Sequence, residues 1–218
     1  MSAEIARKRG RPKNSAATTK RRNDILSSAS RLFAANGYAE TNVDSVAAEL
    51  DISKGTIYRY FSSKRELFFA TVDREFQRLK NTVSESSGDA DNPLDQIVNA
   101  SAGYLGFFKD NPHAIELIMQ ERAAFPDRDP RIRSANDNPM LEKWRDSIQS
   151  LMDAGYVRKM HLDRLMEILS NLLYGTVMSG TLQDEDLDLR ALSHDILDIL
   201  WRGVTTAKAR QEWGLNED

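Results

Sequence analysis

Tyr60 and Lys64 are the residues whose types and spacing most directly suggest chemistry in this sequence. Some oxidoreductases use a tyrosine and a lysine in the pattern Tyr-x-x-x-Lys. A dinucleotide-dependent enzyme also needs a strand, a glycine-rich turn and a helix in succession. The sequence contains no Gly-x-Gly-x-x-Gly and no candidate for parallel strands. We therefore expect no enzyme, no catalytic residue and no cofactor.

Metal and thiol chemistry have no support in the composition. The chain has no cysteine, which excludes disulfides, zinc–thiolate sites and cysteine nucleophiles. His113, His161 and His194 are scattered, and no two lie four residues apart as in a helical metal site. We expect no metal.

Hydropathy argues against a membrane protein. No apolar run approaches the roughly 18–20 residues that cross a bilayer. The basic N-terminus is not followed by an apolar segment of the signal-peptide type. We expect a cytoplasmic protein, associated with the nucleoid if it binds DNA, with no membrane partner.

The charge is unevenly distributed along the chain. The formal net charge is -3. Residues 1–61 nevertheless hold 11 Lys+Arg against 6 Asp+Glu, and residues 1–22 hold eight basic residues against one acidic residue. Such asymmetry indicates that one end meets a polyanion, although a solubilising tail would have the same composition.

The elements that must position Tyr60 and Lys64 are helices, because glycine and proline are sparse and few stretches alternate with period two. A first helix is expected from Thr18 or Thr19 to the Asn36-Gly37 stop. A second follows Thr41 or Asn42, a third begins at Ser53, and a fourth runs from Ser62 or Ser63 to about Val83. Glu66, three residues after Ser63, predicts a capping box.

Beyond a polar joint at residues 84–93, Asn-Pro occurs at 92–93, 111–112 and 138–139. Asparagine as N-cap with proline at the first helical position predicts a helix start each time. We expect helices near 93–109, 112–124, 139–154, 163–182 and 188–208. The prediction is an all-α chain of about nine helices.

Residues 42–60 hold two short helices joined by a tight turn, the helix-turn-helix arrangement, whose second helix enters the DNA major groove. The residues expected to face inward are Val43, Val46, Ala47, Leu50, Ile52 and Ile57. A plain helical hairpin would share that pattern. The outward residues favour DNA because they offer a cation and hydroxyl donors, and Gly55 permits close backbone approach; they are Lys54, Thr56, Tyr58, Arg59 and Tyr60.

Lys64 lies in the first turn of the fourth helix, where a cation opposes the helix dipole. This placement is explained if a phosphate sits between the lysine and the helix N-terminal amides.

The stretch TNVDSVAAELDISKGTIYRYFSSKRELF, residues 41–68, resembles the DNA-binding segment of the TetR family of bacterial transcriptional regulators. The resemblance extends back through ILSSASRLFAANGY and covers about residues 19–80. It implies a two-domain homodimer, with a three-helix helix-turn-helix head on a larger helical domain for ligand binding and dimerisation.

Carried over by position, the resemblance implies roles for individual residues. Asn42, Val43 and Asp44 begin the helix that approaches the DNA, and Lys54, Gly55 and Thr56 head the recognition helix. Tyr58 and Tyr60 fall where family members contact DNA, largely its phosphates, and Lys64 is the phosphate clamp. Arg59 stands where the family often has an aromatic residue or histidine. Asp44 stands where some members use a basic residue, and it either accepts from cytosine N4 or faces solvent.

The basic tail contains Arg9-Gly10-Arg11-Pro12, which resembles the core of an AT-hook. Arg9 and Arg11 suit the negative potential of a narrow A·T minor groove. We expect tail–DNA contact, against the alternative of an inert solubilising tail.

The last two predicted helices are apolar on most sides and so buried on most sides. They could form a monomeric core or pair with their copies, and the resemblance places the dimer interface there. The expected interface residues are Leu169, Leu172, Leu173, Val177, Ile196, Leu200, Trp201 and Val204.

A ligand pocket would be lined by methionines, aromatic residues and a few polar groups. The candidates are Phe108, His113, Met119, Arg122, Phe125, Trp144, Ile148, Tyr174 and Met178. Arg122 or His113 would pair with an acidic ligand, or would simply be solvated.

The sequence thus predicts a basic tail (1–18), a helix-turn-helix domain (19–80, with the motif at 42–61), a connector (81–92) and a ligand-binding and dimerisation domain (93–218). The predicted function is a DNA-binding regulator, a repressor that an unknown small effector releases from a near-palindromic double-stranded operator. The alternative is a DNA-binding regulator without a small ligand, controlled by a protein partner.

Overall fold

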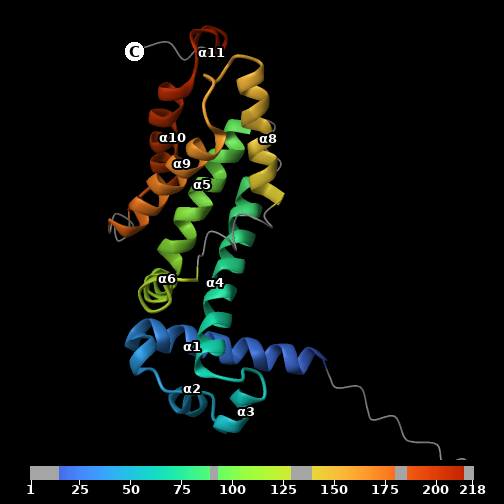
Figure 1. Cartoon of the computed structure of the whole chain (residues 1–218), viewed down its shortest axis with the longest axis vertical. Helices are drawn as coiled ribbons and strands as arrows, with labels where there is room; N and C mark the ends of the chain where they lie inside the picture. The colour runs from blue at the N-terminus through green and yellow to red at the C-terminus, as the bar shows by residue number, and fades with distance from the viewer. Residues whose placement is uncertain (1–14, 89–92, 129–138, 180–185, 214–218) are drawn as a thin grey trace, which may run out of the picture. The chain divides into compact units, whose positions relative to one another are not determined.

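The computed structural model describes residues 15–88, 93–128, 139–179 and 186–213. Within these ranges it contains ten helices and no strand, which confirms the all-α prediction (Figure 1). The helices are α1 (Ser15–Glu40), α2 (Val43–Glu49), α3 (Lys54–Tyr58), α4 (Lys64–Ser87), α5 (Pro93–Asp110), α6 (Pro112–Ala124), α8 (Pro139–Asp153), α9 (Leu162–Met178), α10 (Leu189–Val204) and α11 (Ala207–Trp213).

The chain divides into two compact units, Met1–Thr71 and Val72–Asp218, called here the N-terminal and C-terminal units. The division falls within α4, so the first turns of that helix belong to the N-terminal unit and the rest to the C-terminal unit.

Polar caps start several helices as the sequence predicts. The side chain of Asn42 accepts from the Asp44 amide at 3.0 Å, and that of Ser53 accepts from the Thr56 amide at 3.2 Å. Ser63 Oγ accepts from the Glu66 amide at 3.1 Å, while the Glu66 carboxylate reaches back to the Ser62 amide at 2.7 Å. Each bond satisfies a backbone donor that the helix leaves unpaired.

The three Asn-Pro pairs mark helix starts at Pro93, Pro112 and Pro139. Asn111, however, does not cap α6 with its side chain. Its Nδ2 instead donates to the Phe107 carbonyl at 2.8 Å and so closes the preceding helix α5. The fixed φ of proline is therefore enough to begin α6 there.

Two helix ends differ from the expected ones. Gly37 has a left-handed φ of 85°, as its predicted role as a stop requires, but a short helical segment continues to Glu40. The single helix expected over 188–208 is two, because the chain becomes extended at Thr205. Thr205 forms an antiparallel bridge with Val157, and α11 follows that bridge.

The core of the N-terminal unit is apolar and continuous from α1 to α4. The rings of Phe33 and Phe68 pack edge to face, with 5.0 Å between their centroids. The Tyr38 ring packs against the same Phe68 ring, with 4.9 Å between the centroids. The buried apolar side chains are Ile25, Leu26, Ala29, Phe33, Val43, Val46, Ala47, Ile57, Phe61, Leu67 and Phe68. This core fixes the short helices α2 and α3, which are too short to be stable alone.

In the C-terminal unit α5 packs against α6, α8, α9 and α10 (Figure 1). Its core joins Leu105 and Phe108 of α5 to Leu173 of α9 and Leu197 of α10. No described helix combines the length and the apolar composition that crossing a bilayer requires.

Candidate nucleic-acid interface

A tight turn joins α2 to α3. Asp51 has a φ of 50°, a left-handed conformation that Asp and Asn adopt more readily than most residues. The Ile52 amide donates to the Ala47 carbonyl at 3.0 Å, which closes the turn. Ala47 and Ile57 are buried, at 4% and 1% exposure, so the inward pattern predicted for the motif places the two helices against each other.

The opposite face of α3 is open to solvent. Lys54, Gly55, Tyr58 and Arg59 are exposed, and Tyr58 retains 42% of its surface. The Tyr58 hydroxyl and the Lys54 ammonium are therefore accessible to a partner outside the motif.

The other predicted DNA-binding residues are less open. Thr56 and Tyr60 are half-buried, and the Thr56 hydroxyl lies 3.0 Å from Ser53 Oγ. Asn42 is exposed, but Val43 retains only 3% exposure, so its side chain belongs to the core. Any contact of Val43 with DNA would therefore be made by its backbone and not by its side chain.

Lys54 and Asp44 form an ion pair across the surface of the motif. Lys54 Nζ donates to Asp44 Oδ2 at 2.6 Å, joining the first turn of α3 to the first turn of α2. The hydrogen bond to Asp44 raises the pKa of Lys54 above its usual value. Asp44 is thus open to solvent but paired with Lys54.

Lys64 has a partner within its own unit. Its Nζ donates to the Ala39 carbonyl at 2.8 Å and lies 4.9 Å from the centre of the Tyr38 ring. The lysine thus binds a carbonyl at the end of α1, where a cation is favourable. This explains, without a phosphate, why a cation is tolerated at the start of α4.

A contact that the sequence did not reveal fastens α2 to α1. Glu49 accepts from Ser28 Oγ at 2.9 Å and also pairs with Arg31. The Arg31 hydrogen bond is the main cause that lowers the pKa of Glu49, and burial opposes it. No spacing rule links residues 18 or 21 positions apart on different helices, so only the fold brings them together.

The predicted ligand residues are dispersed in the C-terminal unit. Phe108 and Trp144 are buried in its core, and Met178 and Tyr174 are half-buried. His113 Nε2 lies 3.8 Å from the buried carboxylate of Glu75.

The predicted ligand residues on α6 do not gather with the others. Met119 is 48% exposed and Arg122 is exposed, while Phe125 ends α6 and is half-buried.

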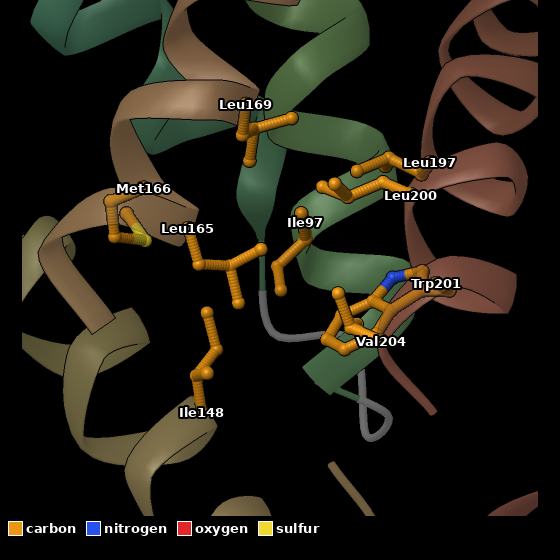
Figure 2. A pocket seen from close by; sticks show the side chains of 9 residues that line it. All are labelled: Ile97, Ile148, Leu165, Met166, Leu169, Leu197, Leu200, Trp201 and Val204. Atoms are coloured by element: carbon orange, nitrogen blue, oxygen red, sulfur yellow. The ribbon is translucent and has the colours of Figure 1, made fainter. Parts of the chain in front are cut away.

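A cavity of about 10 Å³ lies among four helices of this unit. Figure 2 shows its lining side chains converging from α5, α8, α9 and α10. They are Ile97, Ile148, Leu165, Met166, Leu169, Leu197, Leu200, Trp201 and Val204. Of the predicted ligand residues only Ile148 lines it, whereas four residues expected at a dimer interface do.

The residues predicted for the dimer interface divide by exposure. Leu169, Leu173, Val177 and Val204 are buried at 3% to 8% exposure within the chain itself. Ile196, Leu200 and Trp201 are half-buried, and Leu172 is 42% exposed. Ile168 and Ile199 belong to the same apolar helices but were not predicted at the interface, and they are exposed at 39% and 74%.

Comparisons with known proteins agree with this arrangement. The family profile "Bacterial regulatory proteins, tetR family" matches residues 25–71, which include α2, α3 and the start of α4. The regulator HbdR of Aromatoleum sp. (strain CIB) is 26% identical over 63% of this chain and 60% of its own length. The chain thus spans less than two thirds of that relative.

Other relatives match over a longer stretch. The "Fatty acid metabolism regulator protein" of Bacillus subtilis (strain 168) is 22% identical over 83% of this chain and 93% of its own length. A TetR family transcription regulator from Marinobacter aquaeolei VT8 shares the fold, with a TM-score of 0.71 at 15% identity over 88% of this chain and 98% of that one. Residues 25–71 thus match the tetR family profile, and the chain as a whole shares its fold with TetR-type regulators.

Proposed function

We propose that the chain is a sequence-specific, DNA-binding transcriptional regulator, a repressor that a small hydrophobic effector releases from its operator. The observation that carries the proposal is the exposed face of α3 and its C-cap, where Lys54, Tyr58 and Arg59 are accessible to solvent. The opposite face of the motif is buried against the core of the N-terminal unit. Such donors on a short second helix suit the edges of bases and the phosphates of the major groove. The regulator would work at the nucleoid in the cytoplasm.

The contacts divide into two kinds. Lys54, Gly55 and Thr56 at the start of α3 are proposed to meet base edges, with Asn42 and the Val43 backbone at the groove edge. Phosphate contacts are proposed for the exposed or half-exposed donors around them, which are Tyr58, Arg59, Tyr60 and Lys64. Arg9 and Arg11 lie outside the described residues, and their contact with an adjacent minor groove remains a prediction.

A homodimer completes the operator-binding unit. Ile168 and Leu172 of α9 and Ile199 of α10 are exposed apolar side chains, and their exposure in a single chain supports burial against a second copy. Two motifs related by a two-fold axis read half-sites roughly 34–36 Å apart, which predicts a near-palindromic operator.

The effector is proposed to enter the cavity of Figure 2. Its lining is apolar except for the indole N–H of Trp201, whose Nε1 is buried with no hydrogen-bond partner among the described residues. A cavity of about 10 Å³ holds no more than a water-sized group. An effector must therefore part the helices.

The lining indicates the chemistry of the effector. An apolar molecule with one acceptor for Trp201 fits it, and the name of the Bacillus relative links that protein to fatty acid metabolism. We propose an acyl compound as the effector class.

The DNA half of the proposal is tested by selection from a random duplex pool. The purified protein should enrich a near-palindrome. Binding to it, followed by fluorescence anisotropy, should weaken about tenfold or more for Tyr58→Ala, with an unchanged melting temperature because Tyr58 lies outside the core. Failure to enrich any sequence would overturn the proposed function.

The effector half is tested by adding decanoic acid, palmitoyl-coenzyme A or a sterol to the complex. Coupling of typical size would weaken DNA binding about 5–150-fold. Trp201→Phe removes the indole N–H and keeps most of the apolar volume, so it should reduce the response to a ligand that accepts from it. No release by any compound would instead favour control by a protein partner.

A further inference from the structure

We propose that Asp44 is a specificity-determining residue that acts through Lys54, holding the lysine away from phosphates until an operator base accepts it. This inference rests on the proposed function and deepens it. The juxtaposition that carries it is the Lys54 Nζ to Asp44 Oδ2 contact of 2.6 Å on the open face of the motif.

The pair is built from two helix starts. Asp44 lies in the first turn of α2, after the Asn42 cap, and Lys54 is the first residue of α3, after the Ser53 cap. The two caps fix the backbones from which these side chains extend. The carboxylate therefore stands beside Lys54 on the surface that is proposed to meet DNA.

The pair is weak enough to exchange. Both side chains are largely open, at 43% exposure for Lys54 and 54% for Asp44. Ion pairs this exposed hold their partners loosely and are screened by salt. Lys54 can thus leave Asp44 when a better acceptor is offered in the same place.

On DNA without the operator sequence, binding rests on phosphate contacts, and Lys54 meets no base edge that the rest of the motif aligns for it. To reach a phosphate the lysine must give up Asp44, and the carboxylate then faces the negative backbone uncompensated. Asp44 therefore lowers affinity for DNA that lacks the operator sequence, because its carboxylate competes with the phosphates for Lys54.

An operator offers Lys54 acceptors on a base edge. Guanine presents O6 and N7 in the major groove, the acceptors that lysine prefers there. The ammonium can then bind the base while the groove edge keeps Asp44 away from the phosphates. Asp44 thus widens the gap between operator and other DNA and predicts a guanine opposite Lys54.

The experiment compares Asp44→Asn with wild type on two duplexes, the sequence that wild type selects from a random pool and a scrambled duplex of equal length. The amide keeps the size of the side chain and removes the charge. Binding to the scrambled duplex should tighten about tenfold at 100 mM salt, with a salt slope steeper by about 0.9, the value for one additional phosphate contact. Operator affinity should change by less than about threefold, so the specificity ratio falls.

Two further variants separate positioning from general charge. Asp51→Asn removes the same charge from the turn between α2 and α3, at a φ of 50° that asparagine tolerates. It should leave the specificity ratio within about twofold of wild type. In a Lys54→Ala background, Asp44→Asn should tighten binding to the scrambled duplex much less than it does beside Lys54, because only the repulsion between the carboxylate and the phosphates is then relieved.

The inference is overturned if Asp51→Asn acts like Asp44→Asn, or if Asp44→Asn has its full effect without Lys54. It is also overturned if Asp44→Asn weakens the operator complex alone, because Asp44 would then read cytosine N4 directly. A wild-type protein that selects no sequence overturns the proposed function itself, and this inference with it. Melting temperatures within a few degrees of wild type show that the exposed variants fold.

Discussion

Lys64 makes a structural contact within its own unit, and its side chain remains partly accessible to solvent. It binds the Ala39 carbonyl and covers the Tyr38 ring, so it holds the end of α1 beside the start of α4. The side chain is only half-buried. One lysine can therefore position the motif and still attract a phosphate.

Replacing Lys64 with alanine should separate these two roles. Loss of one phosphate contact should weaken binding about tenfold to any DNA sequence and make the salt slope shallower by about 0.9. Loss of the carbonyl contact alone would lower stability by about 0.5–1.5 kcal/mol and leave the slope unchanged. Anisotropy titrations from 50 to 200 mM salt, with thermal unfolding, distinguish the outcomes, and Lys159→Ala, an exposed lysine of the C-terminal unit, controls for net charge.

Glu121 of α6 carries a buried charge in the C-terminal unit. Its side chain is fully buried and pairs with Arg128, which also binds Asp73 at 2.8 and 3.0 Å. Burial raises the pKa of the Glu121 carboxyl above its usual value, and Arg128 opposes the shift.

Glu121 should therefore make stability fall as pH rises. A folded-state pKa above the unfolded one means that the folded state holds the proton more tightly, so the free energy of unfolding decreases from about pH 4.5 through the raised pKa. Glu121→Gln should gain stability relative to wild type over that window, as measured by urea unfolding.

Glu66 offers a control of opposite sign. Hydrogen bonds from Ser62 lower its pKa, so Glu66→Gln should lose stability relative to wild type at neutral pH and the difference should vanish in acid. Parallel curves for wild type and Glu121→Gln would contradict the expected role of burial.

At the scale of elements, α4 and α5 approach closely at Gly103. A Cβ built on Gly103 would lie 2.5 Å from the Cβ of Ser86 and 3.4 Å from the Thr82 carbonyl oxygen. Ser86 Cβ is bonded directly to the backbone of α4, so it cannot move aside as the end of a flexible side chain could. The two helices can therefore hold this separation only with glycine at 103.

Gly103→Ala should lower the free energy of unfolding by about 1–3 kcal/mol, because the helices must move apart. Gly106→Ala, one turn along the same helix, is the matched control. Its Cβ would meet Leu189 Cδ1 at an ordinary 3.5 Å, so helix propensity should make it neutral or stabilising by up to about 1 kcal/mol. Equal changes in the free energy of unfolding for the two substitutions would show that α4 moves away from the new methyl group without loss of stability.

Local signals predicted the elements well. The Asn-Pro pairs give the starts of α5, α6 and α8, and the capping residues give those of α2, α3 and α4, because each start depends on residues within one turn. The break between α10 and α11 escaped prediction because it depends on the bridge from Thr205 to Val157, far away in the chain.

The site was predicted in part for the same reason. The outward residues of α3 follow from period and motif. The Lys54–Asp44 and Lys64–Ala39 contacts depend on how helices meet, which no local pattern encodes. Of the cavity lining only Ile148 was among the predicted ligand residues, because Leu165 and Leu197 are indistinguishable in sequence from other core leucines.

At the scale of the whole molecule, α9 and α10 each carry apolar side chains that are exposed in the single chain. Their inner faces, with Leu169, Val177 and Leu197, are already buried in the core. The outer side chains Ile168, Leu172 and Ile199 are therefore those on which association of two copies would depend. Their burial against a second copy would remove this apolar surface from water, which favours association.

Replacing Leu172 and Ile199 together with glutamate should convert the proposed dimer to a monomer, because four carboxylates would meet across the two-fold axis without counterions. The fold should survive, since both side chains are exposed in the single chain. Light scattering coupled to size exclusion measures the mass, and Met119→Glu, at 48% exposure on α6, is the control that should leave it unchanged.

The monomer should bind half of a selected palindrome with much lower affinity, because each half-site then loses the effective concentration that its linked neighbour provides. A double variant that keeps the mass of two chains would place the interface elsewhere.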